Sequence, residues 1–71
     1  MSAKEMFENL GYEYEIKKTR IIARLYDTDD MLAISISFHT ITKRINIDCL
    51  SEDLDMNELQ AINKQVEELN W

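Results

Sequence analysis

The sequence predicts an α+β fold in which two helices cover one face of an antiparallel sheet. Near both ends of this 71-residue chain, apolar residues recur every three or four positions, as on one face of a helix. Between these ends apolar and polar residues alternate, as in strands that have one buried face. Only short connections separate the strands, so neighbours pair antiparallel. We therefore expect a single α+β domain over residues 1–71, built as a two-layer sandwich.

A short first helix is predicted over Ala3–Leu10. Ser2 and Glu5 have the spacing of a capping box, in which each side chain accepts a hydrogen bond from the backbone of the other residue. Gly11 follows at the position where many helices end in a left-handed residue, which glycine adopts without strain. The helix is therefore expected to end before Gly11.

Three to four strands are expected to follow as an antiparallel meander. Period-two alternation covers four segments of the chain, which are Tyr12–Ile16, Ile21–Tyr26, Leu32–Phe38 and Arg44–Cys49. Lys18-Thr19-Arg20 interrupts the alternation, so Tyr12–Leu25 is either one bent strand or two. Asp27-Thr28-Asp29-Asp30 is rich in side chains that bond their own backbone, which predicts a turn.

One phase of the strands is apolar and is expected to face the helices. In the third segment this phase contains Leu32, Ile34, Ile36 and Phe38. In the last segment it contains Ile45, Ile47 and Cys49. We therefore predict that Cys49 is a small buried side chain with an inert thiol.

The closing segment, Asp55–Trp71, predicts a longer amphipathic helix packed on the apolar face of the sheet. Asp55 and Glu58 form a carboxylate variant of the capping box. Apolar residues of the helix form a stripe roughly 140° wide. These residues are Met56, Leu59, Ile62, Val66 and Leu69. Leu59 and Ile62 lie inside the stripe, so both are expected to be buried.

Composition excludes several classes of protein. The net charge of −6 disfavours nucleic-acid backbones and anionic membranes as partners. Cys49 and His39 are each the only residue of their type, so neither an intrachain disulfide nor a His/Cys zinc site is expected. No apolar run has the length of a membrane span, and the first residues lack the apolar core of a signal peptide. We expect a cytoplasmic location.

No constellation of side chains predicts catalysis. Ser35 and Ser37 precede His39 on one strand face, but no oxyanion-hole glycine or orienting carboxylate accompanies them. The turn at Asp27–Asp30 lacks the glycine and the terminal glutamate of a calcium loop. We therefore expect no catalytic, cofactor-binding or metal-binding residues, and not an enzyme.

The sheet face turned away from the helices, or an edge strand, is the candidate partner surface. Ile22, Arg24 and Tyr26 share the outward phase, and Tyr and Arg are frequent anchors in interfaces. The expected partner is a protein or a second copy of this chain. Six of the eight basic residues lie in the strand region, namely Lys17, Lys18, Arg20, Arg24, Lys43 and Arg44. Nucleic-acid binding is disfavoured, because the glycine- and aromatic-rich strands of single-strand binders are absent.

The two ends of the chain carry a family resemblance. Residues 3–13 read AKEMFENLGYE, and residues 56–71 read MNELQAINKQVEELNW. These segments resemble the opening and closing segments of small uncharacterised phage and prophage proteins of low-GC Gram-positive bacteria. Closing helices in that group commonly end in Gly-Trp, and Asn70 stands here in place of the glycine. The resemblance implies an accessory protein that works in the cytoplasm of a bacterial host cell, and it implies no activity.

The leading hypothesis is therefore a non-catalytic interaction module, a phage or prophage accessory protein that binds a host or phage protein. Its alternative is a nucleic-acid-associated regulator, which uses the sheet face or acts as an acidic DNA mimic. An electrophoretic mobility shift with single- and double-stranded DNA separates the two.

Overall fold

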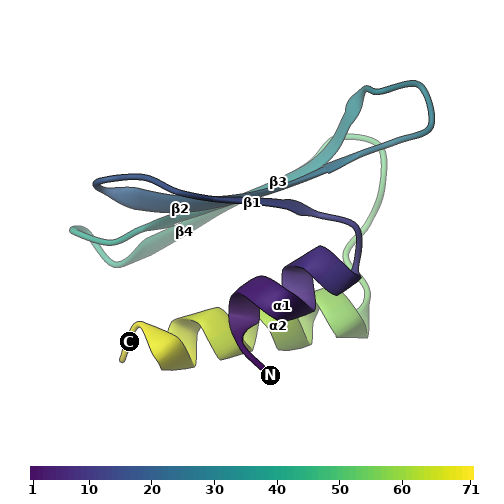
Figure 1. The fold of residues 1–71 in the computed structure, drawn as a ribbon. Coiled ribbons are helices and arrows are strands. Elements are labelled where there is room, and N and C mark those ends of the chain that lie inside the picture. Colours follow the sequence, from purple (N-terminus) through teal and green to yellow (C-terminus); the bar gives the residue numbers. More distant parts are fainter.

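The two helices lie side by side on one face of a four-stranded sheet (Figure 1). A computed structural model describes residues 1–71. Its elements are, in order, α1 (Ala3–Asn9), β1 (Glu13–Ile16), β2 (Arg20–Tyr26), β3 (Leu32–His39), β4 (Arg44–Cys49) and α2 (Met56–Glu68). The strands pair antiparallel in the spatial order β1-β2-β3-β4. The predicted α+β meander between two helices is thus confirmed.

The stretch Tyr12–Leu25 forms two strands and not one bent strand. Ile16 of β1 pairs with Ile21 of β2, and the Lys17 N–H donates to the Arg20 carbonyl at 2.8 Å. This hydrogen bond closes a tight turn between the strands. The chain thereby places β1 at one edge of the sheet and β4 at the other.

Both helices begin with the predicted capping boxes. The Ser2 hydroxyl accepts a hydrogen bond from the Glu5 N–H at 3.1 Å, and the Asp55 carboxylate accepts one from the Glu58 N–H at 3.0 Å. The two glutamates return the contact by accepting from the backbone N–H of the capping residue. Each box satisfies backbone donors that the first helical turn leaves unpaired.

Both helices also end in the same way, with a left-handed residue and a backbone hydrogen bond that turns back into the last turn. Gly11 has a φ of 92°, and the N–H of Tyr12 donates to the carbonyl five residues before it at 3.0 Å. Asn70 takes the same role after α2 with a φ of 58°, and the N–H of Trp71 makes the corresponding bond at 3.1 Å. These are Schellman motifs, and the prediction for Gly11 is confirmed.

The core lies between the helices and the inner face of the sheet. Phe7 of α1 is at its centre, because its ring packs against three other rings, those of Tyr12, Tyr14 and Phe38. The core residues are Phe7, Tyr12, Ile21, Ala23, Ala33, Ile34, Ile36, Phe38, Ala61 and Ile62. None of them comes from β4.

A β-bulge at Ala33 changes the phase of β3. Leu25 pairs with Ile34, but the next residue, Tyr26, pairs with Leu32, so Ala33 is the extra residue. Ala33 and Ile34 are both fully buried. Paired residues share a face, so Leu32 lies beside Tyr26 on the outer face. The prediction that Leu32 points inward is wrong, because alternation in the sequence does not reveal an inserted residue.

The face that α2 turns toward the core is more polar than its sequence predicts. Its buried residues are Glu58, Ala61, Ile62 and Gln65. The prediction for Ile62 is therefore confirmed, but Leu59 is 42% exposed and Met56 is exposed as well. The difference arises because the Tyr12 hydroxyl donates to the Glu58 carboxylate and the Tyr14 hydroxyl donates to the Gln65 side chain. These hydrogen bonds let polar side chains occupy the buried face.

Candidate interaction surface

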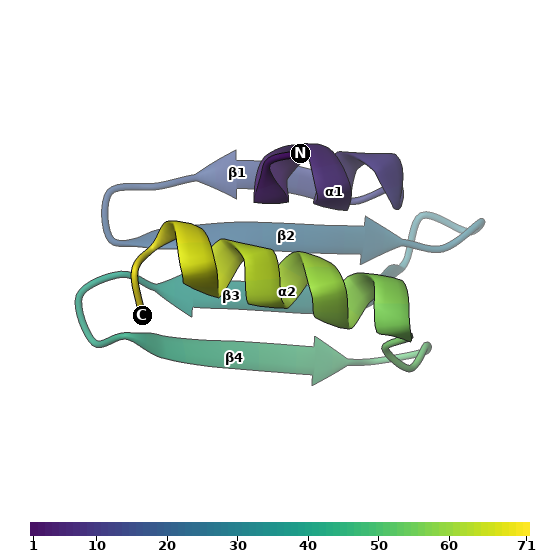
Figure 2. The same ribbon diagram turned by 90° about the horizontal axis from the view of Figure 1, so that it is seen from below.

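The inner face of β4 is apolar and lies largely beyond both helices. In Figure 2, α1 lies over β1 and α2 crosses β2 and β3, while most of β4 is left beside them. Ile45 and Ile47 are 38% and 40% exposed, although they pair with the fully buried Phe38 and Ile36 on the inner face. The predicted phase of this strand is correct, but no helix covers it.

Cys49 shares this exposure. It pairs with Ile34 on the inner face, yet the free thiol belongs to an exposed residue. The prediction that Cys49 is buried and inert is therefore wrong as to burial. The error lies in the expected width of the helical layer and not in the strand register.

A further exposed apolar side chain, that of Leu59, comes from α2. On the side toward α1, the Glu68 carboxylate of α2 accepts a hydrogen bond from the Ala3 N–H at 2.9 Å. Leu59 precedes Glu68 by nine residues, which is a rotation of about 180° around a helix. Its side chain therefore leaves α2 on the side toward β4. We call Ile45, Ile47, Cys49 and Leu59 the β4 strip.

The backbone of β4 is also unpaired along its outer edge. The Leu50 N–H donates to the Ala33 carbonyl of β3 at 2.8 Å. This hydrogen bond shows which residues of β4 turn their backbone groups toward β3, because every second residue does so. Residues 44, 46 and 48 then direct their N–H and C=O groups toward β3, and residues 45, 47 and 49 direct theirs away from the sheet. The ladder has no bulge here. A strand with such a free edge is a template for pairing with another chain.

The outer-face residues predicted to form a partner surface lie in different environments. Ile22 is only 2% exposed, so its expected exposure is wrong. It pairs with Glu15, whose carboxylate lies 3.7 Å from Arg24 Nη1 and 3.7 Å from Lys17 Nζ. Long charged side chains thus surround Ile22 and reduce its exposure. Tyr26 is exposed, and a binding role for Arg24 and Tyr26 stays a prediction.

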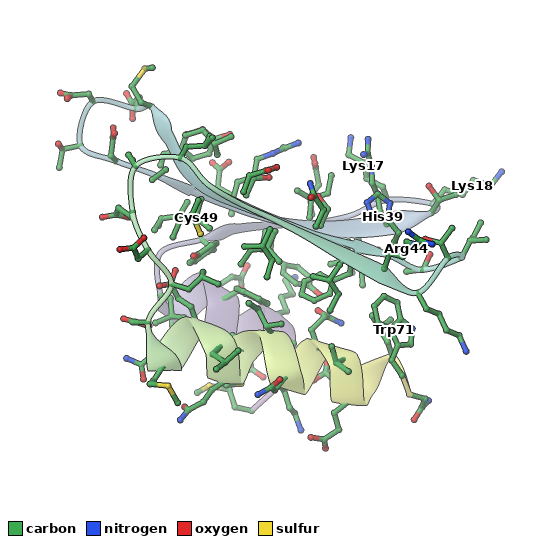
Figure 3. All side chains as sticks on the ribbon, turned by 180° about the vertical axis from the view of Figure 1, so that it is seen from behind. Lys17, Lys18, His39, Arg44, Cys49 and Trp71 are labelled. Carbon is green, nitrogen blue, oxygen red and sulfur yellow. The ribbon has the colours of Figure 1, made fainter.

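Basic side chains gather at one end of the sheet. Arg20 pairs with His39, and His39 pairs with Arg44, so the three lie in a row across β2, β3 and β4. Figure 3 shows Lys17 and Lys18 at the same end of the sheet as His39 and Arg44. Neither Arg20 nor Arg44 has a carboxylate within ion-pair distance. This basic end is a second candidate surface, and it suits an anionic partner.

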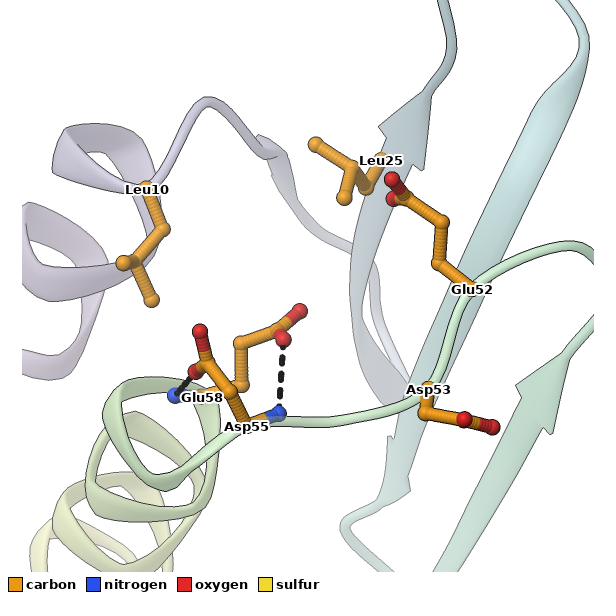
Figure 4. A pocket seen from close by; sticks show the side chains of 6 residues that line it. All are labelled: Leu10, Leu25, Glu52, Asp53, Asp55 and Glu58. Carbon is orange, nitrogen blue, oxygen red and sulfur yellow. Dashed lines mark hydrogen bonds between the residues drawn. The ribbon is translucent and has the colours of Figure 1, made fainter.

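An open hollow of about 440 Å³ lies at the other end of the sheet (Figure 4). Its lining residues are Leu10, Leu25, Glu52, Asp53, Asp55 and Glu58. Asp55 and Glu58 already form the capping box of α2, and Glu58 also accepts from the Tyr12 hydroxyl. Two of its four carboxylates therefore stabilise the fold.

The buried tyrosine hydroxyls are structural donors. Burial, together with the hydrogen bond to Glu58, raises the pKa of Tyr12 above its ordinary value. Burial and the nearby Glu68 carboxylate raise the pKa of Tyr14 as well. Both hydroxyls therefore keep their protons at neutral pH and remain bonded to α2.

No group of three or more His, Cys, Asp or Glu side chains is arranged to hold a metal ion. The Asp27 carboxylate closes the acidic turn by accepting from the N–H groups of Asp29 and Met31. Neither helix combines the length and the apolar character needed to cross a lipid bilayer.

No protein-family model matches this chain, and neither a curated protein nor a solved structure matches it. The resemblance of residues 3–13 and 56–71 to small phage and prophage proteins therefore stays a prediction. The sequence allowed for an edge strand as the binding surface but did not identify the residues of the β4 strip. Its signal was present in the alternation of Ile45, Ile47 and Cys49, but the sequence does not say which strands the helices cover.

Proposed function

We propose that this protein is a non-catalytic interaction module, and that the β4 strip is its binding face for a protein partner. One observation carries the proposal, which is that exposed apolar side chains and a free strand edge occur together on β4. Apolar patches exposed on small domains frequently mark interfaces. A free edge also lets a partner segment add a strand through backbone hydrogen bonds, with side-chain contacts supplying the specificity.

The biological setting rests on the resemblance of the two chain ends. It favours a phage or prophage accessory protein in the cytoplasm of a bacterial host cell, with a host or phage protein as its partner. Asn70 is compatible with this resemblance, because it holds the left-handed backbone, φ 58°, that glycine adopts with least strain. The single free Cys49 fits a reducing compartment.

A matched pair of variants tests the proposal. Tagged wild-type protein, Ile47→Lys and Tyr26→Ala are each used to capture proteins from a lysate of the bacterial host. If wild type and Tyr26→Ala both capture a protein that Ile47→Lys does not capture, the β4 strip is supported as the binding face. Circular dichroism on the same samples establishes that each variant is folded. Loss with Tyr26→Ala alone moves the binding face to Arg24 and Tyr26 on the outer side of the sheet.

A nucleic-acid-associated regulator is the second candidate function. The row of Arg20, His39 and Arg44, next to Lys17 and Lys18, favours it, whereas the net charge of −6 disfavours it. A mobility shift with single- and double-stranded DNA, repeated with Arg20→Glu, tests this function. An acidic DNA mimic instead predicts no shift, and competition with DNA for a DNA-binding protein.

A further inference from the structure

We infer that the free edge of β4 pairs with β4 of a second copy of this chain, antiparallel and about a two-fold axis that passes beside Asn46. The inference rests on the proposed function, since it takes the same β4 strip as the binding face and names its occupant.

The strand is complementary to its own antiparallel copy. Residues that lie opposite each other in an antiparallel pair share a face. When Asn46 lies opposite Asn46 of the second copy, Arg44 lies opposite Asp48 of the second copy on the outer face. On the inner face, Ile45 lies opposite Ile47 of the second copy. The two-fold axis repeats both contacts, so charges pair with opposite charges and apolar side chains with apolar ones.

Neighbouring registers lose this match. Centring the axis on Ile47 places Asp48 opposite Asn46 of the second copy and Arg44 opposite Leu50 of the second copy. Both charges are then without a partner of opposite sign. The charge pattern of β4 therefore selects the register centred on Asn46.

The backbone favours the same register. Ile45 and Ile47 carry the unpaired N–H and C=O groups, and in this register they lie opposite each other. Each such pair exchanges both of its hydrogen bonds. Arg44 and Asp48 then occupy a position without mutual backbone bonds, where Cα atoms are about 4.5 Å apart and side chains come closest. Backbone pairing and ion pairing are thus satisfied together.

A second copy also meets a need of the fold. A chain of 71 residues has a small core, and association is a common way to stabilise such a domain. Pairing brings the β4 strips of both copies to the two-fold axis, where Ile45 and Ile47 lose exposure. The charges of β4 do not repel those of a second copy, because Arg44 and Asp48 give the strand one charge of each sign.

A charge-reversal cycle tests the pairing. Sedimentation velocity over a concentration series is expected to show a dimer for wild type. Arg44→Asp and Asp48→Arg each place like charges opposite each other, and each is expected to weaken dimerisation at least about tenfold. The double variant Arg44→Asp/Asp48→Arg restores opposite charges and is expected to regain most of the affinity. A double variant as weak as the singles overturns the register.

A disulfide tests the axis directly. With the native thiol removed by Cys49→Ser, Asn46→Cys places two thiols at opposed Cα positions about 4.5 Å apart, within the range that a disulfide spans. Mild oxidation is expected to cross-link Asn46→Cys and to leave the control Asp48→Cys uncross-linked. Equal cross-linking of both variants overturns the register.

Failure of this inference is separable from failure of the proposed function. Wild-type protein that stays monomeric at every concentration overturns the second copy as occupant. If that monomer still captures a partner that Ile47→Lys loses, the proposed function stands with a different occupant. If Ile47→Lys changes neither self-association nor capture, both are overturned.

Discussion

Truncation of Ile62 and of Leu59 tests which face of α2 packs on the core. The structure buries only Ile62, whereas the apolar stripe in the sequence predicts that both are buried. Ile62 is 4% exposed and belongs to the core, whereas Leu59 is 42% exposed on the side toward β4. Truncation of a buried Ile to Ala costs about 2–5 kcal/mol, because it combines lost transfer free energy with a cavity. Full burial of Leu contributes about 1.5–3 kcal/mol. The partly exposed Leu59 contributes about half of this at most, and its truncation leaves no closed cavity.

Thermal unfolding followed by circular dichroism measures the difference. For a domain of this size, 1 kcal/mol corresponds to about 4–8 °C in Tm. Ile62→Ala is therefore expected to lower Tm by at least about 10 °C, and Leu59→Ala by less than half as much. Both variants are made in an Arg44→Asp background, so that self-association through β4 does not add to the stability. Equal shifts would refute the orientation of α2 described here and favour the stripe predicted from sequence.

Three further outcomes are expected. Because the pKa of Tyr12 is higher in the folded than in the unfolded chain, the free energy of unfolding decreases as pH rises above about 10. Urea titrations between pH 8 and 11 should show a weaker decrease for Tyr12→Phe. Asn70→Gly should raise Tm slightly, because glycine adopts the φ of 58° with least strain. Asn70→Ala should lower Tm, because alanine has a Cβ and no polar group that could stabilise this left-handed backbone. A thiol reagent should label Cys49 in the native protein at a rate within about threefold of the rate in denaturant, because the residue is exposed. Strong protection of the thiol in the monomer would contradict the finding that no helix covers β4.

The elements of the fold were predictable because their signals are local. Ser2 and Glu5, like Asp55 and Glu58, are three residues apart, so each capping box is visible in the sequence and forms as expected. Gly11 likewise marks a helix end through its own backbone preference. Alternation assigned the strands and most of their faces, since side-chain direction along a strand depends only on neighbouring residues.

The candidate site was not predictable because it depends on contacts between distant segments. Leu32 changes face through an inserted residue that only the pairing with β2 reveals. Ile22 has an outward position, yet charged side chains from neighbouring residues and from β1 surround it. Cys49 has an inward position, yet the residue is exposed. For Ile22 and Cys49 the sequence indicates the direction of the side chain, while exposure is decided by what lies opposite.

Polar contacts explain why the helices leave β4 uncovered. Tyr12 lies just before β1 and Tyr14 lies within it, and their hydroxyls donate to Glu58 and Gln65 of α2. At the other end of α2, Glu68 accepts from the backbone of α1. All three contacts hold α2 toward the β1 side of the sheet. A buried hydroxyl left without a partner costs about 1–3 kcal/mol, so moving α2 over β4 would exchange satisfied hydrogen bonds for apolar contacts. The same contacts that fix the helical layer therefore leave one apolar strand edge free for a partner.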